Sequence, residues 1–176
     1  GQNAFRNCTS LKEIDIPDNV YWIAGNAFYG CTGITDATIS NEGNIGESAF
    51  YGSMTSGNAV LKVSNKGDIY QKAFYGCTGI TDATISNEGN IGDAAFYGCT
   101  ALKTVDIKNK GRVGSEAFRG CVSLETANIA CVTSEQSVEM ETITFPDWTS
   151  TNHSDYSTSS ETYSFTLSEK SALSFD

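Results

Sequence analysis

The stretch Ala27–Gly46, AFYGCTGITDATISNEGNIG, returns letter for letter as Ala73–Gly92, 46 positions further along the chain. A duplication of twenty identical residues indicates that the chain is built from stacked copies of one unit. Fold and function must therefore be inferred from columns of equivalent residues, one residue from each copy.

The unit is 22–24 residues long, because an Ala-Phe pair recurs at that spacing. Its phenylalanines are Phe5, Phe28, Phe50, Phe74, Phe96 and Phe118, and three residues later stand Cys8, Cys31, Ser53, Cys77, Cys99 and Cys121. Apolar residues two apart, such as Ile14 and Ile16, follow in each unit and predict a short strand with one face on a core. Neighbouring units would then form a parallel sheet with strands about 4.8 Å apart.

These columns resemble the BspA-like leucine-rich repeats of bacterial cell-surface proteins, whose units carry I-G-x-x-A-F-x-x-C-x-x-L-x-x-I-x-I-P. Gly46, Gly92 and Gly114 stand in the I-G position, and Pro17 closes the first strand. The third unit departs from the pattern, with Ser53 for cysteine and two inserted residues within Met54–Asn58. The resemblance implies a mostly β, right-handed leucine-rich-repeat solenoid of six units of ~22–24 residues. It also implies adhesion to macromolecules of a host or a neighbouring cell.

The composition changes after Cys131, where the repeat columns end. Residues 132–176 are rich in Ser and Thr and hold eight acidic residues and one lysine. Alternating residues in Tyr163–Leu167 and Ala172–Phe175 predict a β-hairpin, the truncated start of a β-sandwich-like domain, and a disordered tail is the alternative. We therefore expect a repeat domain at 1–131 and a Ser/Thr-rich linker with that truncated start at 132–176.

Charge and composition argue against several classes of function. The formal net charge is −10, and no basic patch suggests nucleic-acid binding. No apolar run in this fragment approaches the roughly 18 residues of a membrane span. The single histidine, His153, lies outside the repeats, so a catalytic triad has no support. We expect no enzyme activity, no cofactor and no metal site.

Five of the six cysteines share one inward column, where a thiol behaves as a small hydrophobic group. Side chains in one column point the same way, so we expect free thiols although neighbouring coils lie within disulfide range. If any disulfide forms, we expect it between Cys121 and Cys131.

Two surface columns are candidates for ligand binding. The first follows each phenylalanine, and its composition is typical of protein interfaces; the alternative is that each ring lies flat on its neighbour and covers the phenylalanines. Its members are Arg6, Tyr29, Tyr51, Tyr75, Tyr97 and Arg119. The second, on the outer strand face, is polar and mixed in sign, as a solvated face would be. Its members are Asp15, Thr38, Lys62, Thr84, Asp106 and Asn128, with Glu13, Asp36, Asp82 and Thr104 alongside.

A third column places asparagine four residues before the aliphatic residue of each I-G position, and it predicts a structural amide ladder or a turn-forming residue. Its members are Asn19, Asn41, Asn65, Asn87 and Asn109.

The sequence thus favours a non-catalytic, extracellular interaction or adhesion module of a bacterial surface or secreted protein, with a protein or glycan ligand. The alternative is a structural spacer, or an accessory repeat segment of a carbohydrate-binding or carbohydrate-active multidomain protein. Uncapped ends of a repeat stack attract further strands. We therefore expect the C-terminal hairpin to dock on the last repeat near Cys131, or the chain to self-associate.

Overall fold

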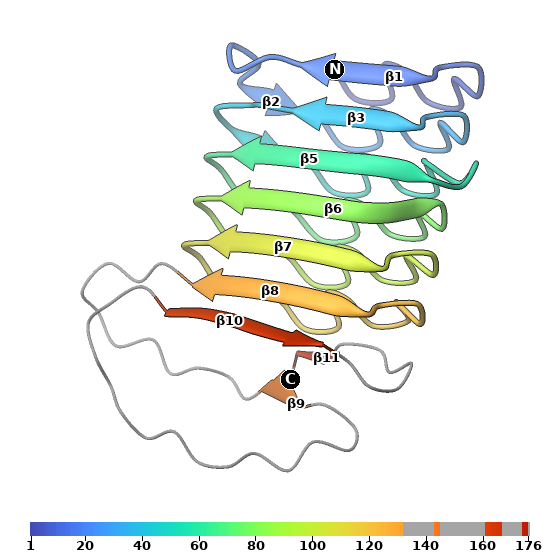
Figure 1. Cartoon of the computed structure of the whole chain (residues 1–176). Helices are drawn as coiled ribbons and strands as arrows, with labels where there is room; N and C mark the ends of the chain where they lie inside the picture. The colour runs from blue at the N-terminus through green and yellow to red at the C-terminus, as the bar shows by residue number, and fades with distance from the viewer. Residues whose placement is uncertain (132–142, 145–160, 167–173, 176) are drawn as a thin grey trace.

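The computed structural model describes residues 1–131, 143–144, 161–166 and 174–175, with side chains described for residues 1–128. In this part of the chain the backbone coils into a parallel β-solenoid of about five turns with a repeat of about 22 residues and no helix (Figure 1). The predicted fold class is confirmed.

Each coil contributes one strand to a continuous parallel sheet, seen as stacked arrows in Figure 1. In order along the sheet the strands are β1 (Glu13–Ile16), β3 (Asp36–Ile39), β5 (Ala59–Asn65), β6 (Ile80–Asn87), β7 (Thr104–Asn109) and β8 (Thr126–Cys131). Their register aligns Ile16, Ile39, Val63, Ile85 and Ile107, all buried. The insertion in the third unit is followed by a register shift between Ala59 and Val60.

A second set of backbone contacts closes each coil behind the main sheet. Strands β2 (Trp22–Ile23) and β4 (Asn44–Ile45) pair in parallel, and single bridges continue this pairing from Ile45 through Ile69 and Ile91 to Val113. Each coil is therefore hydrogen-bonded to the next along these two lines, and also through the phenylalanine turns, where the Phe50 N–H donates to the Ala73 carbonyl (2.7 Å).

The phenylalanine column forms the centre of the core. Adjacent rings are parallel to within 8°, with centroids 4.9–5.0 Å apart from Phe5 to Phe118. Five of the six rings are buried, and each contributes on the order of 1.5–3 kcal/mol. Phe5 is 49% exposed, because its coil has a neighbour on one side only among the described residues.

Two positions in each coil adopt the left-handed backbone region. The first lies two residues after the phenylalanine, where Gly30, Gly52, Gly76, Gly98 and Gly120 have φ of 61–79°. The second lies two residues before it and was not predicted from the sequence. Its members Asn3, Asn26, Ser48, Lys72, Ala94 and Glu116 have φ of 52–57°. A non-glycine residue pays about 1–2 kcal/mol for this conformation. The stack fixes it, since the N–H of Ala94 donates to the Ser115 carbonyl of the next coil (2.9 Å).

The cysteine column consists of free thiols, as predicted. Each buried thiol donates to the carbonyl oxygen of the phenylalanine one coil earlier, as in Cys31 to Phe5 (2.9 Å) and Cys77 to Phe50 (3.1 Å). The Ser53 hydroxyl makes the equivalent bond to Phe28 (2.5 Å). The prediction of burial is wrong for Cys8, which is exposed because it belongs to the first coil.

A bridge between Cys121 and Cys131 is not formed. Cys121 is free and buried, and its thiol points to the Phe96 carbonyl (3.4 Å). The Cys121 side chain therefore points in the same direction as the other thiols of its column.

The asparagine column forms the expected amide ladder over part of its length. Asn65 donates to Asn87 (2.8 Å) and Asn87 to Asn109 (2.9 Å), and Asn41 donates only to the carbonyl of Gly43 (2.7 Å). Asn19 is exposed and does not join the ladder, because Pro17 lengthens that connection by one residue.

The glycine two residues after each buried asparagine is required by the stacking. A Cβ at Gly89 would lie 2.4 Å from the Gly67 carbonyl oxygen, and one at Gly111 would lie 2.3 Å from that of Gly89. No side chain fits between coils at this point.

The far end of the sheet is extended by a strand from the tail. Strand β10 (Glu161–Thr166) pairs antiparallel with β8, the strand of the last repeat, with Glu161 opposite Cys131. Strand β11 (Ser174–Phe175) pairs antiparallel with β9 (Ile143–Thr144). The predicted hairpin and its disordered alternative stay predictions, because the segment between β10 and β11 lies outside the described residues. The open edge of β8 offers a row of unpaired backbone groups, and β10 pairs there. The remainder of the expected tail structure lies outside the described residues.

The buried thiols predict a specific pH dependence of stability. Burial raises the pKa of the Cys77 thiol well above its ordinary value of 9.0. The contribution of this thiol to the stability of the native state should therefore be constant below about pH 9 and fall above it, because only the unfolded chain releases the proton. Replacing Cys77→Ser should make the alkaline fall shallower by up to about 1.4 kcal/mol per pH unit, measured by urea unfolding between pH 7 and about pH 10.5.

Thiol labelling supplies the control for that experiment. In the native protein at neutral pH a thiol reagent should modify Cys8 and spare Cys31, Cys77, Cys99 and Cys121 until denaturant is added. An unchanged alkaline slope in the Cys77→Ser variant, or rapid labelling of the four inner thiols, would contradict the description of this column.

Candidate functional site

The residues that follow the phenylalanines form a continuous row on the outside of the coils. We call Arg6, Tyr29, Tyr51, Tyr75, Tyr97 and Arg119 the tyrosine row. Adjacent tyrosine rings are parallel to within 4° with centroids 4.8–5.0 Å apart. All four tyrosines are half-buried, so the structure combines the two alternatives, with ring faces covered by neighbours and part of each side chain at the surface.

The hydroxyl groups of the row remain available to a ligand. Within residues 1–128 none of the four tyrosine hydroxyls makes a hydrogen bond. Burial raises the pKa of Tyr51, and the phenols of Tyr75 and Tyr29 raise it further. The phenol of Tyr51 is therefore protonated at neutral pH and can donate a hydrogen bond.

Charged groups lie at both ends of the tyrosine row. The guanidinium carbon of Arg6 lies 4.5 Å from the centroid of the Tyr29 ring, a cation–π contact. Arg119, at the other end, forms an ion pair with Glu116. The row thus presents phenols between two guanidinium groups.

An open strip of backbone runs beside the tyrosines. At Gly52, Gly76 and Gly98 an added Cβ would have no atom within 4 Å. A ligand can therefore approach the row from this side without displacing other side chains.

The outer strand face is regular but carries no aromatic residue. Asp15, Thr38, Lys62, Thr84, Asp106 and Asn128 are in register across the sheet. The first four of these are exposed, and Asn128 donates to Asp106 (2.5 Å). The predicted alignment of this column is confirmed, and its chemistry is that of a hydrated polar surface.

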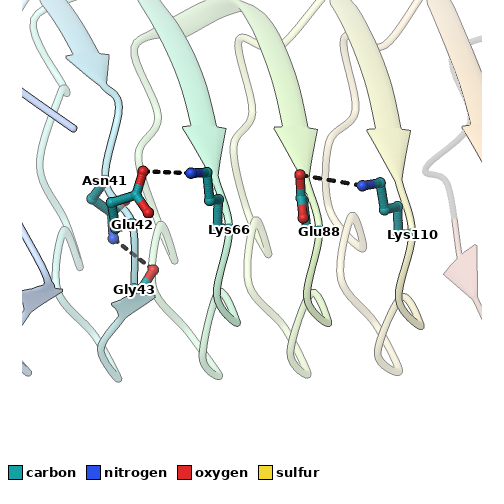
Figure 2. Close-up of polar contacts among 6 residues, drawn as sticks. All are labelled: Asn41, Glu42, Gly43, Lys66, Glu88 and Lys110. Carbon is teal, nitrogen blue, oxygen red and sulfur yellow. Dashed lines mark hydrogen bonds and ion pairs between the residues drawn. The ribbon is translucent and has the colours of Figure 1, made fainter.

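A row of alternating charges, which the sequence analysis missed, follows the asparagine column at the ends of the strands (Figure 2). Glu42 pairs with Lys66 (2.5 Å), and Glu88 pairs with Lys110 (3.2 Å). The signal was present in the sequence, because these four residues occupy equivalent positions with alternating sign. Exposed pairs of this kind contribute little stability, about 0–1 kcal/mol each, but they cancel the charge along this edge.

A small cleft, also missed, lies beside Tyr70. Its lining includes Glu47, Asp68, Tyr70, Asn90 and Asp93. The signal was that Tyr70 occupies the column in which Gly46, Gly92 and Gly114 stand. The repeat is therefore broken at a surface position.

Other kinds of site find no support in the described residues. That part of the chain has no group of three or more His, Cys, Asp or Glu side chains arranged to hold a metal ion. It also has no helical segment that could serve as a membrane span.

Strand ladder, phenylalanine stack and cysteine column together define a leucine-rich-repeat solenoid. A family model described as BspA type leucine rich repeat region, in six copies, matches residues 1–125 and residues 67–171. The chain belongs to this family. A search of the curated proteins and a search of the solved structures each return no match.

Membership has consequences for the class of function. Repeat modules of this type typically bind proteins at surfaces, are common in bacterial surface proteins and are generally non-catalytic. The second match extends beyond Cys131, and the domain boundary predicted there stays a prediction.

The stacked tyrosines should contribute to stability as well as to the surface. Tyr51 stacks on both Tyr29 and Tyr75, and each such contact is worth about 0.5–1.5 kcal/mol. Tyr51→Ser should therefore lower the free energy of unfolding by about 1–3 kcal/mol, and Tyr51→Phe, which keeps the ring, by less than about 0.5 kcal/mol.

Tyr21 provides the matched control, because it is 81% exposed and has no stacked neighbour among the described residues. Urea unfolding of Tyr21→Ser should give a value close to that of the unmodified chain. If Tyr51→Ser lowers the free energy of unfolding no more than Tyr21→Ser does, the stacked tyrosine rings do not stabilise the fold.

Proposed function

We propose that the chain is a non-catalytic, extracellular adhesion module of a bacterial surface or secreted protein. It binds a macromolecule of a host or neighbouring cell through the tyrosine row. The observation that carries this proposal is the stack of four half-buried tyrosines, bounded by Arg6 and Arg119, whose hydroxyls make no hydrogen bond within residues 1–128.

The physical argument for binding rests on preorganisation. Tyrosine and arginine are enriched among the residues that dominate interface energetics. Here each tyrosine ring is held by its neighbours before any ligand arrives, so little conformational entropy remains to be lost on binding. The open glycine strip beside the row gives a macromolecule access to the ring edges and hydroxyls.

The outer strand face is the second candidate surface. It is flat and in register, but its exposed groups are hydroxyls and charges of both signs, which water solvates well. Its polar character makes it the weaker candidate, and it serves as the comparison surface in the experiment below.

A structural spacer is the alternative function, since identical coils with paired charges also suit a segment that only sets length. The glutamate–lysine pairs favour it, because they leave that edge of the solenoid without a charged surface for a partner. A spacer would show no binding through either column.

Binding to an immobilised preparation of host extracellular matrix, measured by a biosensor, tests the proposal. Replacing Tyr29, Tyr51, Tyr75 and Tyr97 together by Phe keeps the stacked rings and removes the hydroxyls. We expect this variant to fold as the parent does and to bind at least about tenfold more weakly.

The control carries Asp15→Asn and Lys62→Gln on the outer strand face and should bind as the parent does. Loss of binding in the control, with retention in the four-phenylalanine variant, would assign binding to the strand face instead. Absence of binding by the parent chain would favour the spacer.

A further inference from the structure

The cleft lies beside Tyr70, which belongs to the column that follows the aliphatic residue of each I-G position. Within residues 1–128, Tyr70 is the only large side chain in this column. The equivalent residues are Ala24, Gly46, Gly92 and Gly114. The backbone keeps the pattern of the other coils, because the Tyr70 N–H donates to the Ile45 carbonyl (2.8 Å) as Gly92 donates to Ile69 (2.7 Å). A coil can therefore fold with glycine or alanine at this position, and the Tyr70 side chain is not needed for the backbone fold.

Tyr70 belongs to an exposed aromatic surface at the side of β2 and β4. Its hydroxyl accepts a hydrogen bond from the Asn44 amide (3.2 Å), and Asn44 is the register partner of Trp22. Tyr21, Trp22 and Tyr70 are 81%, 61% and 40% exposed. Within residues 1–128 these are three of the five exposed large apolar side chains. Exposed aromatic rings gathered on one side indicate a contact surface.

The polar side of the cleft consists of oxygen acceptors held in fixed directions. Asp68 accepts from both the backbone and the side-chain nitrogen of Asn90 (2.7 and 3.1 Å), and Asp93 accepts from the Ser115 N–H (2.9 Å). Each of these carboxylates uses one oxygen in this way. The second oxygen has no partner among the described residues and remains able to accept a hydrogen bond.

We propose that this cleft and the adjoining aromatic rings bind a neutral glycan. Sugar hydroxyls donate hydrogen bonds, and charge-assisted bonds to carboxylates are the strong kind. The C–H faces of sugar rings pack on exposed aromatic side chains, which Trp22 and Tyr70 offer. No basic residue lines the cleft, so an acidic glycan would be repelled.

The geometry favours an oligosaccharide over a single sugar. Trp22 and Tyr70 lie two coils apart, about 10 Å at the 4.8–5.0 Å spacing of the stacked rings. A ligand that touches both rings and the acceptors at Asp68 and Asp93 must span several sugar units. The site is separate from the tyrosine row, so its success or failure is independent of the adhesion proposal.

The full chain can be tested by affinity electrophoresis in gels containing mannan, laminarin, arabinoxylan or dextran, all neutral polysaccharides. We expect retardation by at least one of them, with binding that changes less than about twofold between about 50 and about 500 mM NaCl, because no charged ligand is involved. Tyr70→Gly, which restores the residue of the neighbouring coils, should weaken binding at least about tenfold.

Two further variants separate the glycan from a basic peptide, which the same carboxylates would attract. Asp68→Asn matches Asn44 and Asn90 of its column and keeps an acceptor for Asn90, but it replaces the free carboxylate oxygen with an N–H donor. Glycan binding should therefore weaken by about tenfold and stay insensitive to salt. Trp22→Ala, at a position that is 61% exposed, should weaken glycan binding without loss of fold. Circular dichroism of each variant confirms that it is folded.

The proposal is wrong if none of the four polysaccharides retards the chain. It is also wrong if folded Tyr70→Gly and Trp22→Ala variants bind as the parent does. Binding of oligoarginine that disappears at high salt and in Asp68→Asn, without polysaccharide binding, would assign the cleft to a basic peptide instead.

Discussion

The structure depends on one constraint: every coil lies at the same distance, 4.8–5.0 Å between stacked rings, from the coils beside it. At that spacing the inner side chains of each coil meet their own equivalents. The polar groups of a coil are satisfied by its neighbour, as when the Cys77 thiol reaches the Phe50 carbonyl or Asn65 donates to Asn87. A single coil has neither a core nor partners for these groups, so the stack is stable only as a whole.

The same spacing determines what the surface can do. Stacking that buries Phe50 and Phe74 also holds Tyr51 against Tyr75, so an interaction surface is preorganised by the contacts that fold the chain. It also places Glu42 opposite Lys66 and so removes charge from another edge. Rows of this kind suit extended or repetitive partners. A unique contact requires a break in the repeat, and Tyr70 supplies one.

Most of the fold could be predicted from the sequence because the columns repeat. Ile14, Ile16 and the phenylalanines define the strand, the core face and the period without ambiguity. The left-handed position before each phenylalanine could not be predicted, because Ser48, Lys72 and Ala94 share no property that marks it. Cys8 was misjudged because a column argument assumes a neighbour on both sides, and Asn19 because its connection is one residue longer than those of the other coils. The pairing of β10 with β8 depends on the open edge at the end of the stack and not on the local alternation of residues.

The candidate surfaces were predictable only as alternatives. The tyrosine column was visible, but whether its rings faced outward or covered the core depended on exposure, and the answer was a mixture of both. The cleft at Tyr70 was visible as an interrupted I-G column. The exposure of the rings around it and the orientation of its carboxylates could not be predicted from the sequence columns.

Deletion of one whole coil tests the central claim most directly. Removing residues 74–95 joins Ala73 to Phe96 and leaves every column in register, whereas removing residues 74–84 deletes half a coil. Coil stacking predicts that the first variant unfolds cooperatively in urea with a lower stability and a smaller dependence on urea concentration, because less surface is buried. The half-coil variant should lose the native β-sheet signal in circular dichroism. If the whole-coil variant is as unfolded as the half-coil variant, the coils are not interchangeable units and the account is wrong.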